Sequence, residues 1–254
     1  MTTKQVKQHS PTPEPPVKVK VRRAYLSSAE REEQIVQAAI GFFAETGFSG
    51  NTRDLTKRLG IAHSLLFKYF PTKEDLIERV YQELFEVRWN PEWEFAVRNR
   101  TVPLVDRLVT VYSNYTAVIN TYEWVRIYLF AGLNGTKINA RYWGFVRDNF
   151  FKHVIDELRF ENNKSSVSVI EPTEAEFELV WGLHAALFYI GVRKWVYGLE
   201  VPSDMQVPIR QLVEGFLDAA PRVLNKLEAN KDGKTAERPS AEPVRNPAKS
   251  AIRA

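Results

Sequence analysis

The side chains with the clearest chemical capacity lie in the stretch RDLTKRLGIAHSLLFKYF, residues 53–70. Between residues 53 and 73 there is one acidic residue, Asp54, and there are five basic ones: Arg53, Lys57, Arg58, Lys68 and Lys73. Gly60 divides the stretch into two short predicted helices, and the second carries polar and aromatic side chains on a face too polar for a core. Two helices joined in this way can place the second helix in the major groove of DNA, where its side chains contact base edges. The pattern therefore indicates nucleic-acid recognition.

The positions of these side chains suggest two kinds of contact. Side chains at helix starts and flanks are suited to phosphates, and here they are Thr52, Arg53, Lys57 and Lys73. Side chains on the open face of the second helix are suited to the groove, and here they are His63, Ser64, Phe67, Lys68 and Tyr69. An ordinary solvated helix face has a similar composition, and the residues alone leave that alternative open.

The sequence has no pattern typical of catalysis or metal binding, and we expect no enzyme, no cofactor and no metal site. The chain has no cysteine, which excludes disulfides, thiolate ligands and cysteine nucleophiles. It also lacks a phosphate-binding glycine loop and a nucleophile elbow. His153 and His184 lie on apolar stripes, where they could form a metal pair with Asp156 and Glu157 or contact a ligand. Because there is no His-x3-His spacing, we favour core or interface histidines, each with one hydrogen-bond partner.

Composition favours a soluble protein. Of the 254 residues, 44% are hydrophobic, which is enough for a core. No apolar run is long enough to span a membrane, and the N-terminus lacks the apolar part of a secretory signal, so we expect a cytoplasmic protein without a membrane partner. Both ends, 1–26 and 229–254, are basic and poor in large apolar residues. We expect disordered tails, which either solubilise the chain or act as basic arms on phosphate.

Helical periodicity dominates the rest of the chain. Helix starts are marked by Ser27 with Glu30, Thr72 with Asp75, Thr173 with Glu176, and by Asn51 or Thr52 before the second helix. Apolar residues recur at i, i+3, i+4 and i+7 in each segment, and short alternating runs typical of strands are nearly absent. The predicted fold class is all-α. Asn90 and Pro91 mark the boundary between a small unit, 27–87, and a larger one, 88–228.

Residues 31–84 resemble the TetR family of bacterial transcriptional regulators. The resemblance is carried by Arg31, Ile35, Ala38, Ala39, Phe42, Glu45, Gly47, Phe48, Arg53, Asp54, Leu55, Gly60, Ile61, Leu66, Phe67, Tyr69, Phe70, Lys73, Glu74 and Leu76. It implies a three-helix helix-turn-helix DNA-binding domain at 27–87 and favours DNA contact over a merely solvated face. It also implies that 88–228 is a helical effector-binding and dimerisation domain. The homodimer would pair through the last two helices, about 173–197 and 208–228.

By the same resemblance, the protein is expected to be a ligand-responsive repressor that binds double-stranded DNA as a dimer at a palindromic operator. Its unknown small-molecule effector would bind among side chains of the second domain. The candidates are Tyr112, Tyr115, Trp124, Tyr128, Trp181, His184 and Phe188. Helical cores have the same composition, so a purely structural interpretation of this set stays open.

Three positions depart from the family pattern. Ala62 stands where Ser or Thr usually opens the recognition helix, and alanine cannot cap. Leu65 stands where Ser or Thr commonly contacts phosphate, and it can offer only an apolar contact, such as one with a thymine methyl. Lys68 replaces a frequent aromatic residue and can reach a guanine or a phosphate. Ala62 and Leu65 keep open a second function, that of a ligand-binding or interaction protein that has lost specific DNA binding.

Overall fold

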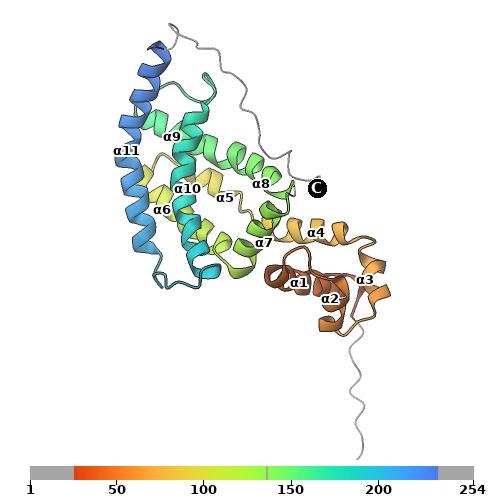
Figure 1. Cartoon of the computed structure of the whole chain (residues 1–254). Coiled ribbons are helices and arrows are strands. Elements are labelled where there is room, and N and C mark those ends of the chain that lie inside the picture. The colour runs from red at the N-terminus through yellow and green to blue at the C-terminus, as the bar shows by residue number, and fades with distance from the viewer. Residues whose placement is uncertain (1–25, 136, 234–254) are drawn as a thin grey trace, which may run out of the picture.

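The computed structural model describes residues 26–135 and 137–233, and every regular element in these ranges is a helix (Figure 1). This confirms the predicted all-α fold class. The predicted tails lie outside the described residues, except for Leu26 and residues 229–233. At 229–233 the last helix continues beyond its predicted end at 228.

The N-terminal unit contains α1 (Ser28–Thr46), α2 (Thr52–Leu59), α3 (His63–Tyr69) and α4 (Lys73–Tyr81). A capping box opens α1, because the Ser27 hydroxyl accepts a hydrogen bond from the Glu30 amide at 3.2 Å and the Glu30 carboxylate accepts one from the Ser27 amide at 2.8 Å. Thr72 and Asp75 form the same arrangement at α4. Both predicted helix starts are therefore confirmed.

The larger unit contains α5 (Glu92–Arg98), α6 (Leu104–Ile119), α7 (Tyr122–Leu133), α8 (Ile138–Val146), α9 (Lys152–Glu161), α10 (Glu174–Trp195) and α11 (Gln206–Gly233). The predicted capping box of Thr173 with Glu176 opens α10. The short helix α5 has no counterpart in the sequence prediction, because seven residues are too few to establish a helical period. A π-helical turn, Arg147–Phe151, lies between α8 and α9.

One hydrophobic core joins the two units. A second π-helical turn, Gln82–Glu86, follows α4 and carries Phe85 into the larger unit. The Phe85 ring stacks on Tyr81 at 5.2 Å and packs against Trp124 at 4.8 Å and Tyr142 at 5.3 Å. The N-terminal unit is therefore packed onto the larger unit through buried side chains.

Arg126 of α7 makes a second connection between the units. Its Nε donates a hydrogen bond to the carbonyl oxygen of Ala44, in the last turn of α1, at 2.6 Å. Its Nη1 donates to the carbonyl oxygen of Trp195, the last residue of α10, at 3.5 Å. Close by, the Phe130 ring lies where a Cβ on Gly47 would come within 3.0 Å, so glycine permits this close approach of α1 to α7. One guanidinium thus connects the ends of two helices that belong to different units.

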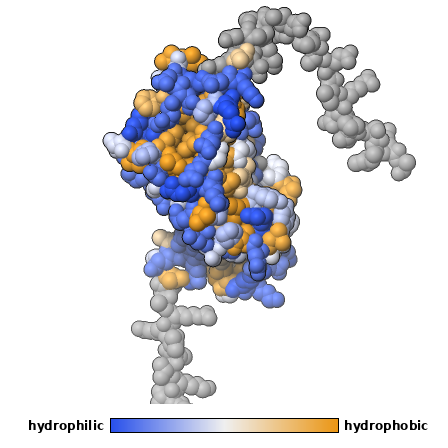
Figure 2. Space-filling view, turned by 90° about the vertical axis from the view of Figure 1, so that its left-hand side faces the viewer, coloured by the Kyte–Doolittle hydropathy of each residue, from blue (hydrophilic) through white to orange (hydrophobic). Residues whose placement is uncertain are grey.

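The helices α10 and α11 lie side by side at one edge of the larger unit (Figure 1). On this side of the molecule an apolar area is bordered by hydrophilic surface (Figure 2). Among the described residues, α10 is the one helix long and apolar enough to cross a membrane, and half of its apolar window is buried within the fold. This pattern is typical of a core helix that keeps one face open.

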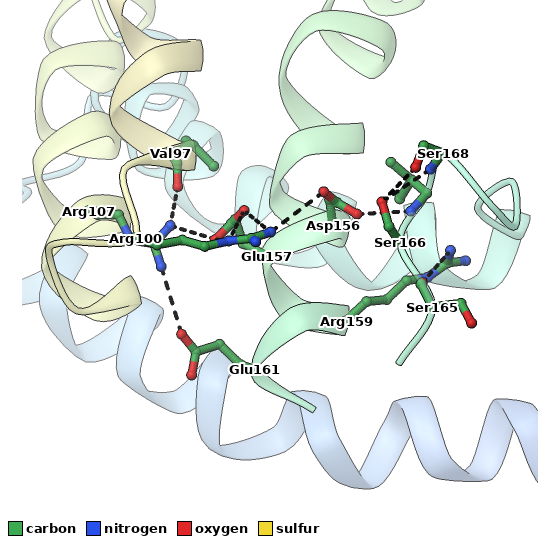
Figure 3. A network of polar contacts seen from close by, with 11 residues as sticks. Val97, Arg100, Arg107, Asp156, Glu157, Arg159, Glu161, Ser165, Ser166 and Ser168 are labelled. Carbon is green, nitrogen blue, oxygen red and sulfur yellow. Dashed lines mark hydrogen bonds and ion pairs between the residues drawn. The ribbon is translucent and has the colours of Figure 1, made fainter. Parts of the chain in front are cut away.

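A buried ion network joins α6 and α9 to the segment after α5 (Figure 3). The Glu157 carboxylate accepts hydrogen bonds from Arg107 at 2.8 Å and from Arg100 at 2.9 and 3.1 Å. The side chains of Arg107 and Glu157 are only 3% and 2% exposed. Arg107 also donates to the carbonyl oxygen of Val97. The network therefore fixes three segments of the larger unit to one another.

Candidate nucleic-acid interface and ligand pockets

The helix pair α2–α3 is built from local sequence signals. The side chain of Asn51 accepts a hydrogen bond from the Arg53 amide at 2.9 Å, so Asn51, and not Thr52, caps α2. Gly60 ends α2 with φ 64° and ψ 35°, a left-handed conformation that glycine adopts without strain. Leu55 and Leu66 are buried and anchor the two helices on α1. The remaining faces of α2 and α3 are thereby turned outward.

Half of the ten residues predicted to contact DNA are exposed on the outward face. Arg53, Lys57, Ser64, Phe67 and Lys68 are exposed. In the described part of the chain, Arg53, Lys57 and Lys68 have no ion-pair partner, which leaves their charges available to phosphate or bases. The structure therefore places these five side chains on one accessible part of the N-terminal unit, formed by two consecutive short helices.

The other predicted contacts are partly engaged within the protein. His63 packs edge-on against the Phe67 ring at 4.8 Å, and its Nε2 lies 3.1 Å from the Thr52 hydroxyl. Lys73 Nζ donates to the carbonyl oxygen of Gly50 at 2.7 Å, which ties the start of α4 to the loop before α2. Leu65 and Tyr69 are half-buried. These partly buried side chains therefore lie next to the exposed residues of α2 and α3 and help to support them.

The departure at Ala62 has a structural counterpart. Ala62 is the N-cap residue of α3 and makes no side-chain hydrogen bond. Arg58, in contrast, is turned away from α3, because it pairs with Glu45 at 2.6 Å and lies over the Phe42 ring. The basic surface is consequently carried by Arg53, Lys57 and Lys68.

All seven residues predicted to contact an effector pack in or against the core of the larger unit. Tyr112, Tyr115, Trp124 and His184 are at most 3% exposed. Tyr128 and Phe188 are half-buried and pack on the same core. The seventh, Trp181, lines a small pocket of about 180 Å³ together with Trp143 and Phe151. The aromatic set is thus mainly a packed cluster with one small opening.

His184 lies at the centre of this cluster. Its ring is 4.9 Å from Trp143, 5.2 Å from Tyr115 and 5.4 Å from Phe151, and its Nδ1 has no hydrogen-bond partner. Burial lowers the pKa of His184 to about 3. The histidine is a neutral core residue, as predicted, but the expected hydrogen-bond partner is not found at Nδ1. Among the described residues, no group of three or more acidic or histidine side chains is placed to hold a metal ion.

Because the unfolded chain takes up a proton on His184 near pH 6.5 and the folded chain resists it, stability should fall as the pH drops below 6.5. We expect a loss of about 2 kcal/mol between pH 7 and pH 5 from this residue alone. His184→Phe should remove that part of the pH dependence, as measured by urea denaturation at fixed protein concentration. His63→Phe, in the N-terminal unit, retains His184 and is the control. Identical pH profiles for wild type and His184→Phe would contradict the expectation.

The sequence did not indicate a second pocket, which lies in the larger unit. It has a volume of about 550 Å³ and lies between α6, the end of α10 and the segment 199–205. Its lining includes Thr116, Asn120, Gly191 and Lys194. None of these residues belongs to the predicted aromatic set, because small polar residues on a helix give no periodic signal for a cavity.

Comparison with known proteins identifies the N-terminal unit. Residues 35–80 match the model of a family described as bacterial regulatory proteins, tetR family. This confirms the resemblance of residues 31–84, and a family of regulatory proteins agrees with the expectation that the chain is not an enzyme.

Solved structures similar to the whole fold include a tetR-family transcriptional regulator from Streptomyces coelicolor, with 18% identity, 84% of this chain and 100% of that chain covered, and a TM-score of 0.55. Mycobacterium smegmatis AmtR is also similar, with 18% identity and a TM-score of 0.50. The match covers 86% of this chain and 99% of that chain. At this identity the likeness shows the fold alone.

Proposed function

We propose, from the match of residues 35–80 to the tetR family of bacterial regulatory proteins, that the protein is a dimeric, ligand-responsive repressor of transcription that reads a near-palindromic operator. The proposed domains are the DNA-binding domain at 27–87 and the effector-binding and dimerisation domain at 88–228. The observation that carries the proposal is the accessible face of α2 and α3, with unpaired charges at Arg53, Lys57 and Lys68.

On this face the two helices have different tasks. Arg53 and Lys57 of α2 bind phosphates and fix the position of the domain on the duplex. Ser64 and Lys68 of α3 contact base edges in the major groove, and Phe67 contacts an apolar base edge such as a thymine methyl. Thr52, His63, Leu65, Tyr69 and Lys73 complete the surface as partly buried neighbours.

Dimerisation uses the open face of α10 and α11. Gly182 of α10 and Gly215 of α11 are exposed, and a Cβ on either would meet nothing within 4 Å. Ala185 and Ala186 continue the row of small residues along α10. Small side chains allow helix backbones to approach closely, which supports the pairing of these two helices with their copies in a four-helix bundle. The apolar area on this side of the molecule agrees with that use (Figure 2).

The two recognition helices of the dimer would read half-sites about 34 to 36 Å apart, or a multiple of that distance. An effector that favours a different spacing of the helices lowers the affinity for the operator by linkage. The second candidate function is that of an interaction protein without specific DNA binding, and it rests on the missing side-chain cap at Ala62. In vitro selection of bound duplex DNA separates the two, because only the first predicts enrichment of one palindromic sequence.

Substitution of two lysines tests the division of tasks. Lys57→Ala should weaken binding to selected and random DNA equally and reduce the slope of log affinity against log salt by about one. Lys68→Ala should lower the preference for the selected sequence, at a cost of about 1–3 kcal/mol at the base pair it contacts. Fluorescence anisotropy over a salt series measures both. Equal losses on selected and random DNA for Lys68→Ala would contradict its role in base contact.

A further inference from the structure

The pocket beside the end of α10 has walls of two kinds. Ile190, Leu199, Val201 and Met205 form an apolar side. Thr116, Ser113 and Asn120 of the α6 segment form a polar side. With a volume of about 550 Å³, the pocket lies in the usual range for sites that bind small organic molecules. Its ligand should therefore combine an apolar body with one polar group.

On the polar side, both hydroxyl donors are already in use. The Thr116 hydroxyl, on a side chain that is 4% exposed, donates to the carbonyl oxygen of Tyr112 at 2.7 Å. The Ser113 hydroxyl donates to the carbonyl oxygen of Val109 at 2.7 Å. The Asn120 Nδ2 donates to the carbonyl oxygen of Leu187 at 3.2 Å, whereas its Oδ1 has no hydrogen-bond partner. The two hydroxyl groups consequently use their hydrogens within α6 and keep their oxygens as acceptors, whereas the Asn120 Nδ2 keeps one further hydrogen.

The surrounding backbone also favours a positively charged ligand. Two helices end at this pocket, α6 before Asn120 and α10 at Trp195, and the C-terminal end of a helix carries partial negative charge. The cationic side chain on the lining, Lys194, lies with its Nζ 4.4 Å from the centre of the Trp195 ring. Its charge is therefore directed to that ring at the edge of the pocket.

We propose that this pocket binds a small organic amine, with its ammonium group donating to the Thr116 and Ser113 hydroxyl oxygens and its apolar body against Ile190 and Met205. An ammonium has three donors and no acceptor, which matches hydroxyl groups whose hydrogens are already used within α6. The identification of the amine as the effector rests on the proposed function, whereas the binding of the amine to the pocket does not.

The position of the pocket gives it a route to the DNA-binding domain. The backbone oxygen of Asn120 accepts a hydrogen bond from the Trp195 Nε1 at 2.6 Å. The backbone oxygen of Trp195 in turn accepts one from Arg126, which holds the Ala44 carbonyl of α1. A molecule that moves the end of α10 therefore acts on the residue that holds the last turn of α1.

Isothermal titration calorimetry of the full-length protein without DNA tests the proposal, with octylamine, 1-octanol and octanoate as probes of one chain length. Octylamine should bind at least ten-fold more tightly than 1-octanol, and octanoate should not bind. Thr116→Val keeps the shape of the wall but removes its acceptor, and it should weaken octylamine about ten-fold. Thr56→Val is the matched control, because Thr56 is also buried and also donates to its own helix.

A second pair of variants keeps the test valid if Thr116→Val does not fold. Ala117→Trp fills the pocket from an exposed position of α6 and should abolish octylamine binding, whereas Ala140→Trp, at an exposed alanine of α8, should leave it unchanged. Octanoate or 1-octanol binding as tightly as octylamine would overturn the proposal. So would octylamine affinity that is unaffected in both Ala117→Trp and Thr116→Val.

The outcome of the octylamine titration does not depend on the proposed function. Failure of the DNA selection with intact octylamine binding would reject only the regulatory role of the protein. Loss of octylamine binding with intact DNA selection would reject only the pocket assignment.

Discussion

Glu157→Ala should lower the free energy of unfolding by about 3–5 kcal/mol, one of the largest effects of any single substitution in this chain. Within residues 26–135 and 137–233, Glu157 is the one carboxylate that both Arg100 and Arg107 contact within 3.2 Å. Its removal leaves the Arg107 guanidinium charged inside the larger unit, where its side chain is 3% exposed. The half-exposed Glu161 carboxylate, 3.8 Å from Arg107, then remains as the nearest counter-charge of this buried guanidinium. The cost of removing Glu157 is therefore much larger than the net stabilisation by the intact pair.

Glu45→Ala is the matched control for this prediction. Glu45 contacts Arg58 at 2.6 Å, which is shorter than the 2.8 Å between Glu157 and Arg107, but both side chains are about half exposed. Water and salt screen this pair, so its loss should cost less than about 1 kcal/mol. Urea denaturation of the two variants at equal protein concentration measures the difference. Equal losses would show that burial does not control the cost.

Gly182→Arg should convert the protein to a monomer and reduce its affinity for a full operator at least about a hundred-fold, because binding to the second half-site is then no longer intramolecular. Gly182 lies inside α10 with open space around it, and arginine is the better helix former, so the isolated chain should fold. The substitution therefore affects the proposed interface without affecting the core. Sedimentation equilibrium and operator titration report the two consequences.

Gly144→Arg provides the comparison for Gly182→Arg. Gly144 is an exposed helical glycine like Gly182, and a Cβ added at it would also meet nothing within 4 Å. It lies in α8, however. This variant should remain dimeric. If Gly182→Arg sediments as a dimer with unchanged operator affinity, the open face of α10 is not the interface.

Local features were the part of this fold that the sequence could predict. The starts of α1, α4 and α10 follow from three short capping patterns, and the end of α2 follows from Gly60, because each depends on residues within one turn of the chain. The exposed positions of α3 follow from the helical period once Leu66 is placed inward. Such signals do not depend on the rest of the fold.

Features that join distant segments were not predictable in this way. Arg107 lies among apolar residues of α6 and pairs with Glu157, fifty positions further along the chain, and neither residue indicates the other. The aromatic residues predicted to surround an effector could equally form a core, and the structure places most of them there. The large pocket is formed where a loop covers the ends of two helices, which no single segment encodes.

The contact of Arg126 with α1 also has a mechanical consequence. The N-terminal unit is held to the rest of the molecule by the chain after α4, by the buried Phe85 and by the packing of α1 on α7, which includes the bond from Arg126 to the carbonyl of Ala44. Because a packed boundary of this kind does not let one helix turn freely, a displacement at the end of α10 that acts through Arg126 should tilt the N-terminal unit as one body.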